Sequence, residues 1–193
     1  MKIDLHMHTT YSDGKLTPTE LVRLLHDRGV DIAAVSDHDS TEGITEALAA
    51  AEAYPDLRIV PAVEISADHP TDPKGDVHVL GYFLDHHNAE LGTTLASFRD
   101  NRLYRGQKMV ERLIELGYKI TWEHVLEIAG EAGIGRPHIA QALVDGGYIA
   151  QIKDAFDGIL NDDGVAFVDR PHISMAESAA LIRAAGGVTV LAH

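Results

Sequence analysis

Strand-like segments alternate with helix-like segments near both ends of this 193-residue chain. The run Ile32–Val35 is continuously apolar, as expected of a strand buried on both faces, whereas Ile3–His8 alternates apolar and polar residues. The predicted strands cover residues 3–8, 32–35, 58–63, 77–82 and 188–191. This alternation predicts an α/β fold with parallel strands and outer helices, arranged either as a barrel or as an open sheet.

Helix-start signals follow the first two predicted strands. Thr17 is expected to be the N-cap of the first helix, with Pro18 at the first helical position and Glu20 completing a capping box. Thr41 is expected to cap the second helix. These local signals place a helix after each strand, as a parallel sheet requires.

The segment between about residues 88 and 170 has a different, purely helical pattern. A long helix is predicted over 89–116, and others start at Thr121, at Pro137 and near residue 151. We interpret 88–170 as a helical insertion between two strands of the α/β unit, which would comprise 1–87 and 171–193. The insertion is expected to form a cap that shapes the substrate pocket.

Composition narrows the classes of function. The net charge is −14 with histidine neutral, which disfavours tight binding to long nucleic acid. A small phosphorylated substrate stays compatible, because bound divalent cations invert the local field. The absence of cysteine excludes disulfides and thiolate zinc sites, and 12 histidines favour nitrogen and oxygen metal ligands. No signal peptide or membrane span is evident, so a cytoplasmic location is expected, and oligomeric state is not readable.

Potential metal ligands cluster at the ends of the predicted strands. His6 and His8 point to the same side of a strand, with Cα atoms about 6.5 Å apart, close enough to bind one metal. Asp13 lies in the next loop, and His38 lies in a polar cluster directly after the second strand. Glu64 is flanked by β-branched apolar residues, a costly place for a carboxylate unless it is paired or metal-bound.

Two more histidines complete the set, one at the start of the fourth strand and one at the end of the last. The candidate metal ligands are His6, His8, Asp13, His38, Glu64, His78 and His193. Taken singly, the His6–His8 pair has a chance alternative and Glu64 has a buried-ion-pair alternative. Together they are too many for one four-coordinate zinc, and they suit two or three Mn, Zn or Fe ions. Such a centre suits phosphoester hydrolysis, because the metals activate water and neutralise phosphate oxygens.

These residues also resemble a known family. The runs 4–14 (DLHMHTTYSDG) and 36–39 (SDHD), with Glu64, His78 and the final Leu-Ala-His, are similar to the PHP (polymerase and histidinol phosphatase) family. The resemblance extends along the whole chain. The helical segment with Gly-Arg-Pro-His at 135–138 resembles the bacterial branch that includes 3′,5′-nucleoside bisphosphate phosphatases and a 5′-3′ exoribonuclease.

The resemblance implies a fold and a metal centre. The fold would be a distorted (β/α)7 barrel with a trinuclear centre. The implied ligand sets are His6, His8 and Glu64 for the first metal, Glu64, His78 and His193 for the second, and Asp13 with His38 for the third. The catalytic residues would be His6, His8, Glu64 and His193. One of Asp37 and Asp39 is expected simply to cap the next helix, and either is placed to orient histidine ligands or relay a proton.

The resemblance also implies that Arg136 and His138 contact the substrate phosphate, where a helix start beside an arginine provides an anion site. The simpler reading of these two residues alone is a solvated arginine and a helix-start histidine. The expected function is a metal-dependent phosphoric ester hydrolase acting on a nucleotide or on short RNA 5′ ends. The alternatives are a histidinol-phosphate phosphatase, a non-catalytic nucleotide-binding domain and a metal-dependent amidohydrolase.

The sequence departs from the family pattern after its last strand. The family has a later Asp-x-His motif and further strands that close the barrel, and neither occurs before His193. We therefore expect the sequence to be the N-terminal part of a longer protein. An intact mass near 20.9 kDa would contradict this expectation.

Overall fold

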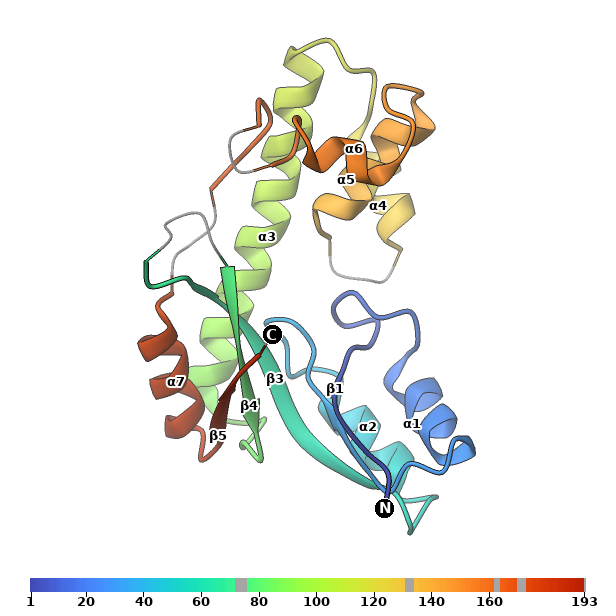
Figure 1. Ribbon diagram of the computed structural model, residues 1–193, viewed down its shortest axis with the longest axis vertical. Coiled ribbons are helices and arrows are strands. Elements are labelled where there is room, and N and C mark those ends of the chain that lie inside the picture. The colour runs from blue at the N-terminus through green and yellow to red at the C-terminus, as the bar shows by residue number, and fades with distance from the viewer. Residues whose placement is uncertain (72–75, 131–133, 162–163, 170–172, 193) are drawn as a thin grey trace. The chain divides into compact units, whose positions relative to one another are not determined.

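The computed structural model describes residues 1–71, 76–130, 134–161, 164–169 and 173–192. The chain forms two compact units (Figure 1). The first contains Met1–Phe98 and His172–His193, and the second contains Arg99–Pro171. Each unit has its own buried apolar core. The interpretation of 88–170 as an insertion that acts as a cap stays a prediction.

The first unit is built on a five-stranded sheet with the strands in chain order. The strands are β1 (Ile3–Met7), β2 (Ile32–Val35), β3 (Arg58–Asp68), β4 (Asp76–Tyr82) and β5 (Val188–Leu191). β1, β2 and β3 are parallel, whereas β4 is antiparallel to both β3 and β5. The expectation of an all-parallel sheet was therefore wrong for β4. The connection from β3 to β4 is too short for the crossover of a dozen or more residues that parallel strands need.

The sheet curls but does not close in the described residues, where β1 and β5 are its two edges. The Tyr82 hydroxyl donates a hydrogen bond to the Leu5 carbonyl at 2.9 Å. This contact joins β4 to β1, which are not neighbours in the sheet, so the sheet must curve toward the face that carries Tyr82. The mixed α/β class is confirmed, and a closed seven-stranded barrel is not.

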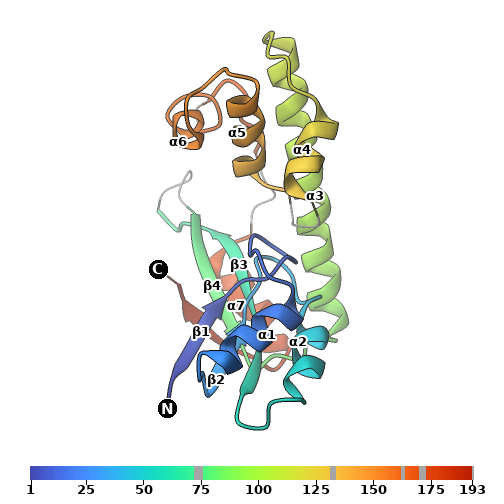
Figure 2. The same cartoon turned by 90° about the vertical axis from the view of Figure 1, so that its right-hand side faces the viewer.

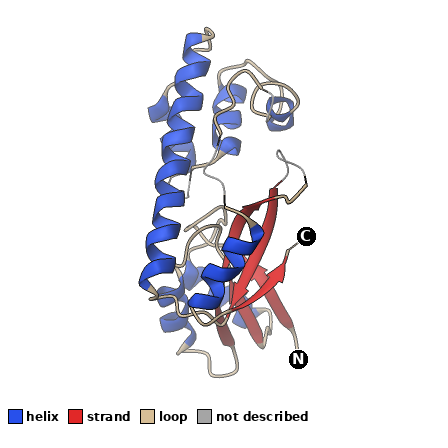
Figure 3. Cartoon of the chain, turned by 90° about the vertical axis from the view of Figure 1, so that its left-hand side faces the viewer, coloured by secondary structure: helices blue, strands red, loops and turns tan. Residues whose placement is uncertain are grey.

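The two faces of the sheet differ in character. On β3, the side chains of Val60 and Ala62 pack on the inner, concave face, and Glu64 follows them in the same register. Val63 and Ile65 point the other way, into the core beneath the helices. Full burial of each such apolar side chain contributes about 1.5–3 kcal/mol. Figure 3 shows the strands as one layer with helices along one side.

The outer face of the sheet is covered by helices from several parts of the chain (Figure 2). These are α1 (Pro18–Asp27), α2 (Ile44–Ala51), the first turns of α3 (Ala89–Glu115) and α7 (Met175–Ala184). Because these helices cover the outer face, the concave face is left for a small apolar cluster and for the polar residues that lie beyond it.

The helix-start predictions met different outcomes. The Thr17–Glu20 capping box is present, and α1 begins at Pro18 as predicted. Thr41 does not cap α2, whose N-cap is Gly43 without a side-chain hydrogen bond. The Thr41 carbonyl instead accepts from the Ile44 amide at 3.2 Å, so a turn precedes the helix.

The described part of the second unit consists of helices joined by turns and loops. It contains the rest of α3 together with α4 (Trp122–Ala129), α5 (Arg136–Asp145) and α6 (Ile152–Phe156). Thr121 caps α4 as predicted, accepting from the His124 amide at 3.1 Å. α6 is shorter than the helix expected near 151–160. In the described residues, no helix has the length and apolar character needed to cross a membrane.

Candidate metal centre

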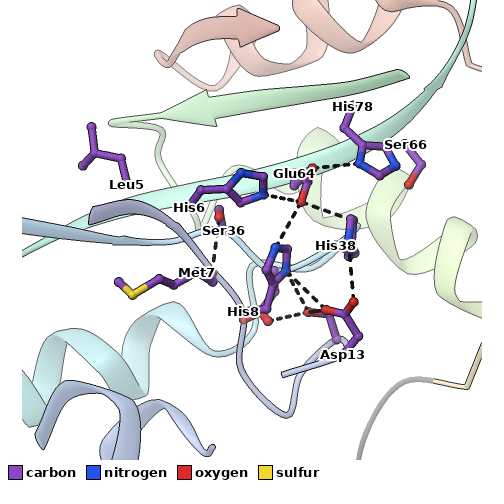
Figure 4. Close-up of polar contacts among 12 residues, drawn as sticks. Leu5, His6, Met7, His8, Asp13, Ser36, His38, Glu64, Ser66 and His78 are labelled. Carbon is purple, nitrogen blue, oxygen red and sulfur yellow. Dashed lines mark hydrogen bonds and ion pairs between the residues drawn. The ribbon is translucent and has the colours of Figure 1, made fainter. Parts of the chain in front are cut away.

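Four histidines and one glutamate converge on the concave face of the first unit (Figure 4). His6 and His8 come from β1 and its end, His38 from the loop after β2, Glu64 from β3 and His78 from β4. Asp13, in the loop after β1, lies beside His8 and His38. The structure thus brings together six of the seven predicted ligands. The seventh, His193, lies outside the described residues.

Strand direction explains how ligands from opposite strand ends meet. β1 and β2 end at this edge of the sheet, and their polar residues follow directly. Glu64 was expected at the end of its strand. This was wrong, because β3 continues to Asp68 and pairs there with β4. β4 is antiparallel, so His78 near its start lies opposite Ser66, which is two residues beyond Glu64 on β3. Its position at a strand start is therefore consistent with the same site.

Glu64 is the centre of the cluster and is fully buried. Its Oε2 lies 2.8 Å from His6 Nε2 and 3.2 Å from His8 Nε2. The same oxygen lies 3.5 Å from His38 Nδ1. Its other oxygen, Oε1, lies 2.8 Å from His78 Nδ1. One carboxylate thus faces three imidazoles with one oxygen and a fourth with the other, as a ligand shared between metals would.

Asp13 extends the cluster toward solvent. Its Oδ1 lies 3.4 Å from His8 Nδ1, and its Oδ2 lies 3.9 Å from His38 Nε2. The Asp13 side chain is 63% exposed, in contrast to Glu64. The cluster therefore has a buried side at Glu64 and an exposed side at Asp13.

The electrostatics keep Glu64 and His38 in the forms that bind metal, whereas they favour protonation of His8. Burial alone would raise the pKa of Glu64, but hydrogen bonds from His78, His8 and His6 lower it, so the pKa lies well below the usual range. Burial lowers the pKa of His38 and keeps its ring neutral at pH 7. Burial also acts to lower the pKa of His8, but the hydrogen bond with Glu64 and the charge of Asp13 raise it overall.

The donor set fits divalent metals. The ligand atoms form three groups, and within each group they all lie within 4.8 Å of one another. The groups are His6, His8 and Glu64; His8, Asp13 and His38; and His38, Glu64 and His78. In addition, His38 Nδ1 is buried and forms no hydrogen bond among the described residues, because its 3.5 Å contact with Glu64 Oε2 lacks hydrogen-bond geometry. Buried polar atoms in that state are rare unless an ion or water completes them.

The three groups overlap, which limits how they are filled. A neutral imidazole has a single lone pair, so His8 and His38 can each ligate only one metal at a time. If His8 joins His6 and Glu64, and His38 joins Asp13, one group keeps three described ligands and two groups keep two. The described residues therefore favour one well-formed metal position, at His6, His8 and Glu64.

Asp37 and Asp39 do not cap α2, which had been the simpler expectation for one of them. Asp39 has a left-handed backbone, with φ of 50°, and its Oδ1 accepts from the Ser66 amide at 3.1 Å. The Asp37 carboxylate accepts from Thr9 and Ser12. Both aspartates hold the backbone around the ligands. The supporting roles of Thr9 and Ser12 were missed from the sequence, which carries no signal for contacts so distant along the chain.

The two predicted substrate ligands lie in the second unit. The Arg136 guanidinium donates to the Leu160 carbonyl at 3.2 Å and lies over the Phe156 ring, 5.8 Å from its centroid. His138 Nδ1 accepts from the Gly135 amide at 3.0 Å, which secures the start of α5. Pro137 is the second helical residue and not the first, because α5 begins at Arg136. Contact of Arg136 and His138 with substrate stays a prediction.

Comparisons with known proteins agree with the geometry. The PHP domain family matches residues 4–161. A 5′-3′ exoribonuclease of Haemophilus influenzae is 32% identical over all of this chain and 68% of its own. A 3′,5′-nucleoside bisphosphate phosphatase of Chromobacterium violaceum is 32% identical over 99% of this chain and 66% of its own.

Two solved structures have the same architecture over the whole chain. One is a candidate metal-dependent phosphoesterase from Bifidobacterium adolescentis, with a TM-score of 0.81, 36% identity and 66% of its length covered. The other, from Chromobacterium violaceum, is described as an amidohydrolase with bound sulfate and no metal, with a TM-score of 0.85, 31% identity and 67% covered. The chain spans about two thirds of the length of these relatives.

Proposed function

The chain belongs to the PHP domain family, and from that membership and its histidine–glutamate cluster we propose that it is a metal-dependent phosphoesterase acting on phosphate esters of nucleotides. The observation that carries the proposal is Glu64, whose two oxygens face different imidazoles from a fully buried position. A buried carboxylate is costly, and metal ligation beside the four histidines is a use that offsets the cost.

The chain's own residues have distinct tasks in this proposal. His6, His8 and Glu64 hold the best-formed metal position, and His78 and His38 extend it on either side. Two or three bound Mn, Zn or Fe ions would supply an activated water and positive charge for the phosphate oxygens. The exposed Asp13 side leaves space for an anionic ester, and His193 would add a ligand to the position of His78.

The substrate class is proposed from the relatives. One relative is named a 5′-3′ exoribonuclease and another a 3′,5′-nucleoside bisphosphate phosphatase, and each is 32% identical to this chain. These names support short RNA 5′ ends or 3′,5′-nucleoside bisphosphates as the substrates of this chain. A relative at 28% identity, a phosphoribosyl 1,2-cyclic phosphate diphosphodiesterase of Eggerthella lenta, shows that nearby sequences have other phosphoesters as substrates. Arg136 and His138 are proposed to bind the substrate phosphate, since a guanidinium matches its geometry.

The test is phosphate release with manganese, zinc or iron(II) from a panel of phosphoesters. The panel contains a 3′,5′-bisphosphate, mononucleotides, short 5′-phosphorylated RNA, a cyclic phosphate and histidinol phosphate. Release from the bisphosphate or RNA that is lost in His8→Ala is the expected result. Preference for histidinol phosphate would favour that phosphatase instead. Metal uptake without any release would favour a non-catalytic nucleotide-binding domain.

A further inference from the structure

A buried carboxylate that belongs to none of the three ligand groups lies directly behind them. Asp37 is 2% exposed and comes immediately before His38. Its Oδ1 accepts from the Thr9 amide and from the Ser12 hydroxyl, both at 2.6 Å. Its Oδ2 accepts from the Thr9 hydroxyl at 2.7 Å. Three short bonds to a charged acceptor are the strong kind of hydrogen bond, and all three go to one loop.

The backbone of Asp37 is itself fixed. Its carbonyl accepts from the Glu64 amide at 3.2 Å, so the residue is tied to β3. On its other side, the Ser36 amide donates to the Met7 carbonyl at 2.8 Å, which ties it to β1. The carboxylate is thus presented from backbone that is hydrogen-bonded toward both β1 and β3, and its three bonds all go to the 9–14 turn.

The loop that Asp37 holds is the one that carries Asp13. Thr9 is the hub of this loop, because its carbonyl accepts from the Ser12 amide at 3.1 Å and from the Gly14 amide at 2.9 Å. Its hydroxyl also accepts from the Tyr11 amide at 3.2 Å. Thr9 and Ser12 are buried, whereas the Asp13 side chain projects from the turn at 63% exposure. An exposed ligand has little packing of its own, so its position depends on the anchored turn.

We propose that Asp37 is a positioning residue, which holds the 9–14 turn so that Asp13 stands beside His38 and His8 as a metal ligand. This inference rests on the proposed metal centre and assigns one support, Asp37, to one of its metal positions. Asp37 determines the outer metal position, which contains Asp13, and leaves the inner position of His6, His8 and Glu64 in place. Groups that support a metal ligand are worth about 10–100-fold in metal affinity, which sets the expected size of the effect.

The test compares variants of the full chain by metal content, by titration calorimetry with Mn²⁺ and Zn²⁺, and by amide hydrogen exchange. Asp37→Ala should weaken the weaker class of metal sites by about 10–100-fold and leave the tighter class unchanged. It should also speed exchange of the Ser12 and Gly14 amides at least tenfold. Asp13→Ala should lose the same class of sites with unchanged exchange, because it removes the ligand and not the anchor.

Two further variants keep the test decisive if Asp37→Ala does not fold. Asp37→Asn retains an oxygen for the Thr9 amide and the Ser12 hydroxyl, so it should restore most of the metal binding and exchange protection. Ser12→Ala removes one of the three short bonds to Asp37, together with the longer 3.4 Å contacts of the Ser12 hydroxyl with His8 Nδ1 and Asp13 Oδ1, and should give a smaller change in the same direction. Asp27→Ala, an exposed carboxylate on α1, is the matched control and should change neither measurement.

The outcomes separate this inference from the function on which it rests. If the wild-type chain takes up no metal, the proposed metal centre is wrong and the role of Asp37 is wrong with it. If the wild type binds metal and Asp13→Ala loses part of it, but Asp37→Ala and Ser12→Ala match the wild type in affinity and exchange, the positioning role alone is overturned.

Discussion

Replacement of Glu64 by glutamine tests the centre of the cluster most directly. The change keeps the shape of the side chain and removes its charge. Glu64 belongs to two of the three ligand groups, so Glu64→Gln leaves each of those groups with two histidines. Loss of a residue that merely supports a ligand costs about 10–100-fold in metal affinity. We therefore expect loss of this shared ligand to weaken metal binding by more than about 100-fold.

The same substitution has an effect that does not require metal. Glu64 Oε2 lies 3.2 Å from His8 Nε2, where opposite unit charges attract by about 5 kcal/mol at an effective dielectric constant of about 20. The His8 side chain is 21% exposed, so solvent screens part of this attraction. Burial acts to lower the pKa of His8, and the carboxylate opposes it. With the charge removed, the pKa of His8 should fall.

Two measurements check the reasoning. Titration calorimetry gives metal affinity and stoichiometry, and NMR titration of the metal-free chain gives the pKa of His8. Glu52→Gln, which changes an exposed glutamate at the end of α2, is the matched control and should alter neither. Metal affinity within tenfold of wild type in Glu64→Gln, or a His8 pKa that stays the same, would refute the central role of Glu64.

Three other perturbations have equally definite outcomes. Gly14→Ala would place a Cβ 2.2 Å from the His8 carbonyl oxygen, so the turn must shift, and turnover should fall by about 100-fold. Gly92→Ala is the matched control, because its Cβ meets no atom within 4 Å, and it should raise stability by about 0.4–1 kcal/mol. Phosphate release and thermal melting measure turnover and stability, and equal losses of both in the two variants would contradict this reasoning. Arg136→Ala should raise KM for phosphorylated substrates at unchanged metal content, and steady-state kinetics showing the wild-type KM would remove its assigned role. Metal affinity should fall as pH drops from about 7.5 to about 5.5, because protons compete for histidine ligands. As the pH falls, His8, whose pKa is raised, should protonate before His38, whose pKa is lowered. Titration calorimetry at stepped pH that shows no fall in metal affinity would contradict the competition by protons.

Much of the metal centre could be predicted from the sequence because its signals are local. A His-x-His pair on a strand places two imidazoles on one side wherever that strand lies. The β-branched residues on either side of Glu64 indicate that it is buried, and an unpaired buried carboxylate is costly. The strand positions and the Thr17 capping box are local in the same sense, and the structure confirms them apart from the longer β3.

The rest depended on partners that are distant along the chain. A two-residue period indicates a strand but not its direction, so the antiparallel β4 and the continuation of β3 beyond Glu64 became visible only in the sheet. The sequence is compatible with Asp37 as a helix cap or as a support for a histidine. Its actual partners, Thr9 and Ser12, lie 28 and 25 residues away along the chain. The types of ligand were thus encoded in short runs of residues. Which oxygen faces which imidazole, and which aspartate holds which loop, was decided by the curvature and pairing of the sheet.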